Sequence, residues 1–185
     1  DENNPFFIYY AMPTPHWPLE DPPKLYDECN DDAVYGDRKA FCNVLMYGDE
    51  LIGEIVDTLK STNKYENTVM IFLSDNGPNP NWKSDIKLPA GYGQTLPLRG
   101  AKGSTFEGGI RTPSFIYGGY LEKQNCINNG GEYNDMVHIS DWFAIINGMI
   151  GNDDYYDIMN DIDGINLWPD ICGNNDDSET ITQRK

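Results

Sequence analysis

The sequence predicts a layered α/β fold with a largely parallel sheet flanked by helices. Short, almost continuous apolar runs alternate along the chain with segments of helical periodicity. Runs that are apolar at nearly every position are typical of strands buried on both faces. Hydrophobic residues make up 39% of the chain and aromatic residues 12%, so the chain has enough apolar surface to pack into a core.

The first part of the chain is predicted to form one strand and one helix. The strand is Phe6–Ala11, which ends at a proline-rich loop. The helix runs from about Asp32 to Asn63, because its apolar residues recur at intervals of three and four and so share one face. Asp31 and Asp32 are candidate caps for its start, and Ser61–Asn63 is predicted to end it.

Two more strands and one more helix are predicted further along. The strands are Thr68–Leu73 and Ser114–Tyr117, and the helix is Ile139–Ile150. Residues 78–109, between the strands, are irregular and rich in glycine and proline, and loops of this length in a compact domain are usually functional. Residues 1–150 are therefore assigned to the packed domain, and the Asp- and Asn-rich residues 151–185 to an acidic surface loop region.

The charge of the chain excludes some classes of partner. The formal net charge is −17, with 30 acidic and 13 basic residues, so the basic surface that nucleic-acid binding requires is not visible. No apolar run approaches the roughly 20 residues of a membrane-spanning helix. Most of the carboxylates are expected to form a solvated acidic surface.

The four cysteines leave two interpretations open. None lies in a Cys-x-x-Cys pair and histidine is scarce, so a structural zinc site is not expected. The cysteines can form two disulfides, with Cys29–Cys42 as a local pair, or remain four buried free thiols. We favour the disulfides, and with them a protein of the secretory pathway.

Two groups of candidate site residues follow predicted strand ends, where α/β sheets bind ligands. His16, between prolines, can donate a hydrogen bond to an anion or act as a general acid, or else it packs on Trp17. Asp75 and Asn76 offer oxygen ligands to a hard cation such as Ca²⁺, or else they close an Asx turn with Gly77.

Lys102 is the third candidate, because it lies among glycines that permit close approach of a ligand to the backbone. It can provide a point charge for an anion, and the alternative is a solvated loop lysine. Asp49 and Glu50 are expected on a solvated helix face, and Ser140 or Asp141 as a helix cap. These last four residues are not candidates for catalysis.

Taken in order along the chain, these fragments resemble the sulfatase family, and most closely its arylsulfatase B-like group, which removes sulfate from N-acetylgalactosamine 4-sulfate. One motif alone is weak, but six in the family's order make the resemblance specific. The matching segments are Phe6–Ala11 with Pro15–Leu19, Thr68–Gly77, Pro97–Lys102, Phe106–Pro113, Val137–Trp142 and Asp163–Trp168.

The resemblance implies an alkaline-phosphatase-like α/β domain and a sulfuric ester hydrolase. In the family, a cysteine oxidised to formylglycine attacks sulfur and a Ca²⁺ ion polarises the sulfate. His16 would contact the sulfate or protonate the leaving oxygen, Lys102 would bind a sulfate oxygen, and Asp75 and Asn76 would ligate Ca²⁺. The implied substrate is an aryl or sugar sulfate, such as a sulfated glycan, and the implied location is secreted or lysosomal.

The chain also departs from the family. The nucleophile motif Cys-x-Pro-Ser-Arg is absent from this sequence, as is the early aspartate pair that completes the calcium site. We therefore expect a segment from the later part of a catalytic domain, inactive alone. Two alternatives stay open: a non-catalytic sulfatase-like protein that binds sulfated glycans or has a structural role, and a related hydrolase of phosphate esters.

Overall fold

A computed structural model describes residues 4–16, 18–30, 36–79, 93, 95–124, 126, 131–152 and 162–172. The chain divides into two compact units. The first consists of Asp1–Asn63 and Ile71–Ile116, and the second of Lys64–Met70 and Tyr117–Lys185. The α/β class predicted from the sequence is confirmed, with helices in both units and one small sheet.

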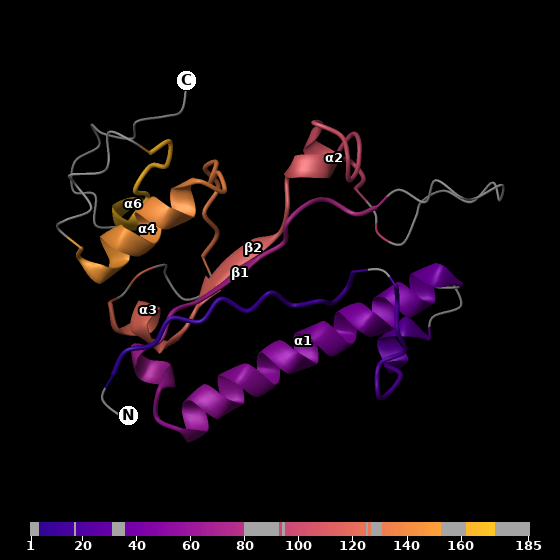
Figure 1. The fold of residues 1–185 in the computed structure, drawn as a ribbon, viewed down its shortest axis with the longest axis horizontal. Helices are drawn as coiled ribbons and strands as arrows, with labels where there is room; N and C mark the ends of the chain where they lie inside the picture. Colours follow the sequence, from indigo (N-terminus) through magenta and orange to yellow (C-terminus); the bar gives the residue numbers. More distant parts are fainter. Residues whose placement is uncertain are drawn as a thin grey trace. The chain divides into compact units, whose positions relative to one another are not determined.

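Helix α1 (Asp37–Ser61) is the longest element of the first unit (Figure 1). It starts at Asp37 rather than near Asp32, after Gly36, whose φ of 57° lies in the left-handed region that favours glycine. The candidate caps Asp31 and Asp32 lie outside the described residues. The helix ends where the sequence places it: the Thr62 amide donates to the Thr58 carbonyl at 3.0 Å, and Asn63 then has a φ of 56°, which does not continue the helix.

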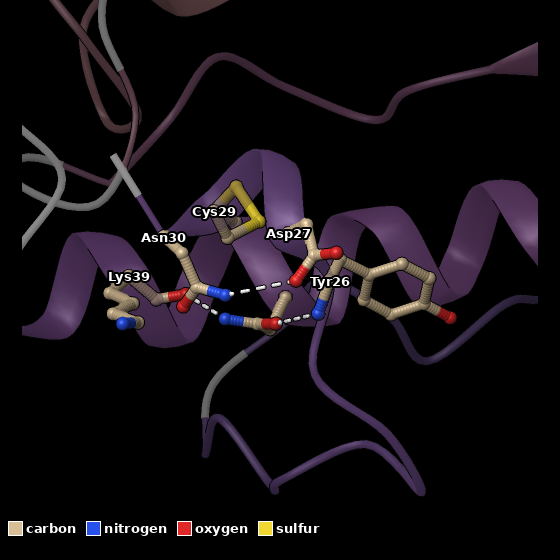
Figure 2. The surroundings of a disulfide bond; sticks show 7 residues. Tyr26, Asp27, Cys29, Asn30 and Lys39 are labelled. Atoms are coloured by element: carbon tan, nitrogen blue, oxygen red, sulfur yellow. Dashed lines mark hydrogen bonds between the residues drawn. A yellow bond between two sulfur atoms is a disulfide. The ribbon is translucent and has the colours of Figure 1, made fainter.

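A disulfide between Cys29 and Cys42 fixes the 3₁₀ helix η1 (Asp27–Cys29) against α1 (Figure 2). The side chain of Asn43 adds two hydrogen bonds, since it accepts from the Tyr26 amide at 2.8 Å and donates to the Lys39 carbonyl at 2.9 Å. The predicted local cysteine pair is therefore confirmed.

Further along α1, Glu50 differs from its prediction as a solvated residue. It forms an ion pair of 2.7 Å with Lys24 and accepts a short hydrogen bond from the Tyr26 hydroxyl. Its neighbour Asp49 is exposed, as predicted. A helical pattern does not reveal which of two adjacent carboxylates meets a loop that returns to the helix.

The sheet consists of β1 (Met70–Leu73) and β2 (Ser114–Tyr117), both at predicted positions. The Ser74 amide donates to the Pro113 carbonyl at 3.3 Å, and the ring of Phe72 stacks on that of Phe115 with centroids 4.9 Å apart. Residue numbers thus rise along one strand as they fall along the other, so this pair is antiparallel. An antiparallel pair occurs in many α/β sheets that are otherwise parallel.

The predicted strand Phe6–Ala11 is not a strand in the structure. No other described segment forms a ladder with it, and a strand exists only through its hydrogen-bonded neighbour. Its large side chains are therefore exposed, from 52% for Phe6 to 85% for Tyr9.

The second unit contains η2 (Tyr65–Asn67), α3 (Gly119–Lys123), α4 (Asp141–Ile150) and α6 (Trp168–Ile171). The Tyr65 hydroxyl donates to Glu122 at 3.1 Å, and a second disulfide joins Cys126 to Cys172. Both disulfide pairs are thus formed, and none of the four cysteines is a free thiol.

Within residues 151–185, predicted as surface loop, the described part includes helix α6 and the buried residues Leu167 and Ile171. Residues 153–161 and 173–185 lie outside the described residues. In the part of the chain that the structure describes, no helix is both long and apolar enough to cross a lipid bilayer.

Candidate functional site

The first part of the candidate site is the turn Ser74–Pro78, here called the Asp75 turn, which directly follows β1. Asp75 is exposed, and one of its carboxylate oxygens accepts the Asn76 amide at 2.8 Å. The Asn76 side chain donates through Nδ2 to the Gly77 carbonyl at 2.8 Å, which leaves its amide oxygen as an acceptor. The turn therefore presents carboxylate and amide oxygens, the ligand types that Ca²⁺ and Mg²⁺ prefer.

The second part is the segment Pro97–Arg111, here called the Lys102 loop. Two backbone hydrogen bonds hold this loop against the Asp75 turn: the Lys102 amide donates to the Pro78 carbonyl at 2.9 Å, and the Gly77 amide donates to the Gly109 carbonyl at 2.9 Å. The Asx turn considered for Asp75 is not formed with Gly77, because the Gly77 amide is used in this contact. Three of the four predicted site residues, Asp75, Asn76 and Lys102, thus come from two segments in direct contact.

Glycine makes this close approach possible. A Cβ atom at Gly77 would collide with the carbonyl of Gly108, and one at Gly108 would collide with the carbonyl of Gly100. Helix α2 (Glu107–Ile110) begins within the loop, and both Gly108 and Gly109 are buried there. The glycine pattern noted in the sequence therefore serves backbone packing as well as ligand access.

The turn at Lys102 is held by Ser104. The Ser104 hydroxyl donates to the Ala101 carbonyl at 2.8 Å, and the Ala101 amide donates back to this hydroxyl at 3.2 Å. The next residue, Gly103, has a φ of 87°, which closes the turn after Lys102. Lys102 itself is only partly exposed, and no described carboxylate lies within ion-pair distance of it.

The third part is the turn that carries His16. The His16 amide donates to the Pro13 carbonyl at 3.0 Å, and the Thr14–Pro15 peptide bond is cis. The side chain of Thr14 lies against Gly48 of α1, where an added Cβ would come within 2.9 Å of the Thr14 hydroxyl oxygen. The exposed His16 is therefore positioned by its own turn and by α1, and Trp17 lies outside the described residues.

Asp141, considered as a helix cap, has a different role. It is 0% exposed, and its two oxygens accept the His138 amide at 2.7 Å and the Ile165 amide at 2.9 Å. It thus joins the segment before α4 to the one before α6. This carboxylate is structural.

Arg99 is a residue of the Lys102 loop that the sequence pattern did not single out. Its guanidinium lies over the ring of Phe106, 3.9 Å from the centroid. The two residues are seven apart in an irregular segment, so no helical or strand period indicates that they meet.

The described residues contain no cluster of three or more His, Cys, Asp or Glu side chains suited to a metal ion. Ca²⁺ takes six to eight oxygen ligands, so Asp75 and Asn76 fit it in chemical type but supply only part of its coordination. Together with a lysine and a histidine, these are residue types that suit the binding of an oxyanion ester.

The chain is therefore an α/β segment that presents carboxylate, amide and lysine groups after a strand end. The Sulfatase family model matches residues 1–151, and the chain belongs to the sulfatase family. It is 31% identical over 171 residues to mouse arylsulfatase J, and the matched region covers 92% of this chain and 26% of that protein. It is 28% identical over 169 residues to human N-acetylgalactosamine-6-sulfatase, and this match covers 91% of the present chain and 29% of the relative.

The solved structures agree with the sequence relatives. The crystal structure of Ps i-CgsB in complex with k-i-k-neocarrahexaose matches with a TM-score of 0.66 and 27% identity, over 87% of this chain and 32% of that one. The chain thus spans about a quarter to a third of the length of these relatives. The predicted sulfatase family and the fold class are confirmed.

Proposed function

We propose that this chain provides part of the sulfate-binding site of a sulfuric ester hydrolase. The observation that carries the proposal is the contact between the Lys102 loop and the Asp75 turn. Through the Lys102–Pro78 hydrogen bond of 2.9 Å, one lysine is held close to a pair of cation-binding oxygens. A sulfate ester needs this combination, because charge develops on its peripheral and leaving oxygens as the S–O bond breaks.

Each residue has a distinct proposed role. Asp75 and Asn76 bind a Ca²⁺ ion, which would polarise the sulfate when bound. Lys102 contacts a peripheral sulfate oxygen through its ammonium group. His16 lies beside the leaving oxygen, to which it donates a proton. The nucleophile is not among these residues, since no cysteine here is followed by x-Pro-Ser-Arg, and we expect this chain alone to be inactive.

The proposed substrate is a sulfated sugar. Two observations support it: one relative is named N-acetylgalactosamine-6-sulfatase, and one similar structure was solved with a neocarrahexaose. The two disulfides support folding in an oxidising compartment, and hence a secreted or lysosomal protein.

The test is hydrolysis of 4-nitrophenyl sulfate by the protein in its full natural length, with 4-nitrophenyl phosphate as the matched alternative substrate. We expect turnover of the sulfate, loss of that turnover after calcium chelation, and recovery when Ca²⁺ is restored. Preference for the phosphate would instead support the related hydrolase of phosphate esters.

A second candidate function is recognition of a sulfated glycan, which is favoured by the similar structure that was solved with a neocarrahexaose. In that case the protein binds sulfated glycans without cleaving them. Binding of N-acetylgalactosamine 6-sulfate with no release of inorganic sulfate by the full-length protein would establish it.

A further inference from the structure

Arg99 combines a fixed position with guanidinium N–H groups that bond to no acceptor among the described residues. The Arg99 Cζ atom lies over the Phe106 ring, 3.9 Å from its centroid, and the Arg99 carbonyl accepts the Gly108 amide at 2.8 Å, so both ends of the residue are held. Stacking uses the face of the guanidinium and leaves the N–H groups around its edge as donors. Phe106 is 44% exposed, so this pair lies at the surface.

The charge around Arg99 is unusual for this chain. Acidic residues outnumber basic ones by 30 to 13 overall, yet the Lys102 loop contains three basic residues, Arg99, Lys102 and Arg111, and one acidic residue, Glu107. Glu107 pairs with Arg111 at 3.5 Å. Among the described residues, no carboxylate lies within ion-pair distance of Arg99 or of Lys102.

Arg99 and Lys102 are close enough to serve one ligand. They are three positions apart in the sequence, so their Cα atoms lie at most about 11 Å apart. The hydrogen bonds from Ser104 to Ala101 and from Gly108 to Arg99 hold the intervening turn. The loop therefore presents two cations, one mobile ammonium and one planar guanidinium, at a fixed spacing along the backbone.

We propose that Arg99 is a substrate-binding residue that recognises a second anionic group on the sulfated sugar, while Lys102 contacts the sulfate that is cleaved. The inference rests on the proposed function, which gives Lys102 its ligand. It identifies the substrate class as sugars with at least two anionic groups. An arginine suits this task because its fork can bind a sulfate or carboxylate with two parallel hydrogen bonds.

The test is equilibrium binding to the full-length protein, measured by calorimetry at low ionic strength. The two probes are N-acetylgalactosamine 6-sulfate and N-acetylgalactosamine 4,6-disulfate. Arg99→Gln should raise the Kd for the disulfate about tenfold, the value of one charge-assisted contact, and change the Kd for the monosulfate less than about twofold. Arg99→Lys keeps the charge but loses the planar fork, so its effect on the disulfate should be intermediate.

Arg38→Gln is the matched control, because it removes one exposed positive charge from the same unit without touching the loop. It should leave both Kd values unchanged. Equal weakening of both ligands by Arg99→Gln would assign Arg99 to loop structure and overturn the inference, as would an unchanged Kd for the disulfate or binding of neither probe. Binding does not require turnover, so an inactive protein would overturn the proposed catalysis and leave this result standing.

Discussion

Asp75 and Asp141 both lie in a Ser-Asp pair next to a regular element, yet the structure gives them opposite environments. Asp75 is exposed after β1 and, within the described part of the chain, accepts the amide of its own neighbour, Asn76. Asp141 is fully buried at the start of α4, and both its oxygens accept backbone amides, one of them 24 residues away. A carboxylate whose oxygens are all used by the backbone stabilises the fold, and one with oxygens left over can bind a ligand.

The largest expected effect is that of Lys102→Ala on catalysis. If Lys102 neutralises charge on the sulfate, its removal should lower the kcat/KM of the full-length protein for 4-nitrophenyl sulfate by about a thousandfold. The melting temperature should change little, because Lys102 is held by its backbone and not by a described ion pair. Lys60→Ala, in the last turn of α1, is the control and should keep full activity.

His16→Gln should distinguish proton donation from simple contact with the sulfate. A general acid matters more when the leaving group is a poor one. The loss in kcat should therefore be about a hundredfold for a sugar sulfate and about tenfold or less for 4-nitrophenyl sulfate. Equal losses for both substrates would assign His16 to binding of the sulfate instead.

Asp141→Ala should act on stability. It leaves the buried amides of His138 and Ile165 without an acceptor, which costs about 3 kcal/mol in the free energy of unfolding. Urea denaturation of the full-length protein measures this change. Asp135→Ala, an exposed aspartate of the same unit, should change stability by less than about 0.5 kcal/mol. An Asp141→Ala variant as stable as the unmodified protein would contradict the structural role assigned to Asp141.

Much of the site could be predicted from the sequence, because its parts depend on local signals. The strand end before Asp75, the glycines around Lys102 and the proline-bounded turn at His16 are all short-range patterns. What could not be predicted depends on contacts between distant segments. The bond from Ile165 to Asp141, and the disulfide over 46 residues between Cys126 and Cys172, leave no periodic trace in the sequence.

The fold shows the same division between local and long-range information. The bounds of β2 and the end of α1 follow from residue type and spacing, and both agree with the prediction. The predicted strand Phe6–Ala11 lacks a paired neighbour among the described residues. A hydrophobic run indicates that a segment suits a buried strand, but it does not indicate which segment pairs with it. The antiparallel direction of the β1–β2 pair likewise has no local signal in the sequence, since it depends on the path of the chain between the strands.

Glu50 is intermediate between the exposed Asp75 and the buried Asp141. Its substitution should have the smallest of the expected effects. Partial burial, and then the hydrogen bond to Glu50, raise the pKa of Tyr26 to about 12. The protonated tyrosine is the favoured form, so its contribution to stability is complete below pH 10 and is lost as the pH rises toward 12. Absorbance titration at 295 nm should show a tyrosine that ionises near pH 12; Tyr26→Phe should remove this transition, and Glu50→Gln should move it toward pH 10.

The most direct test of the central claim is the calcium affinity of the full-length protein, measured by calorimetry for the unmodified form and for Asp75→Ala. Asp49→Ala serves as the control, because it removes an exposed carboxylate from the same unit. We predict that Asp75→Ala raises the Kd for Ca²⁺ at least about a hundredfold, while Asp49→Ala leaves it unchanged. An unchanged Kd in the Asp75→Ala protein would show that the Asp75 turn does not bind the cation, and would contradict the site proposed for this chain.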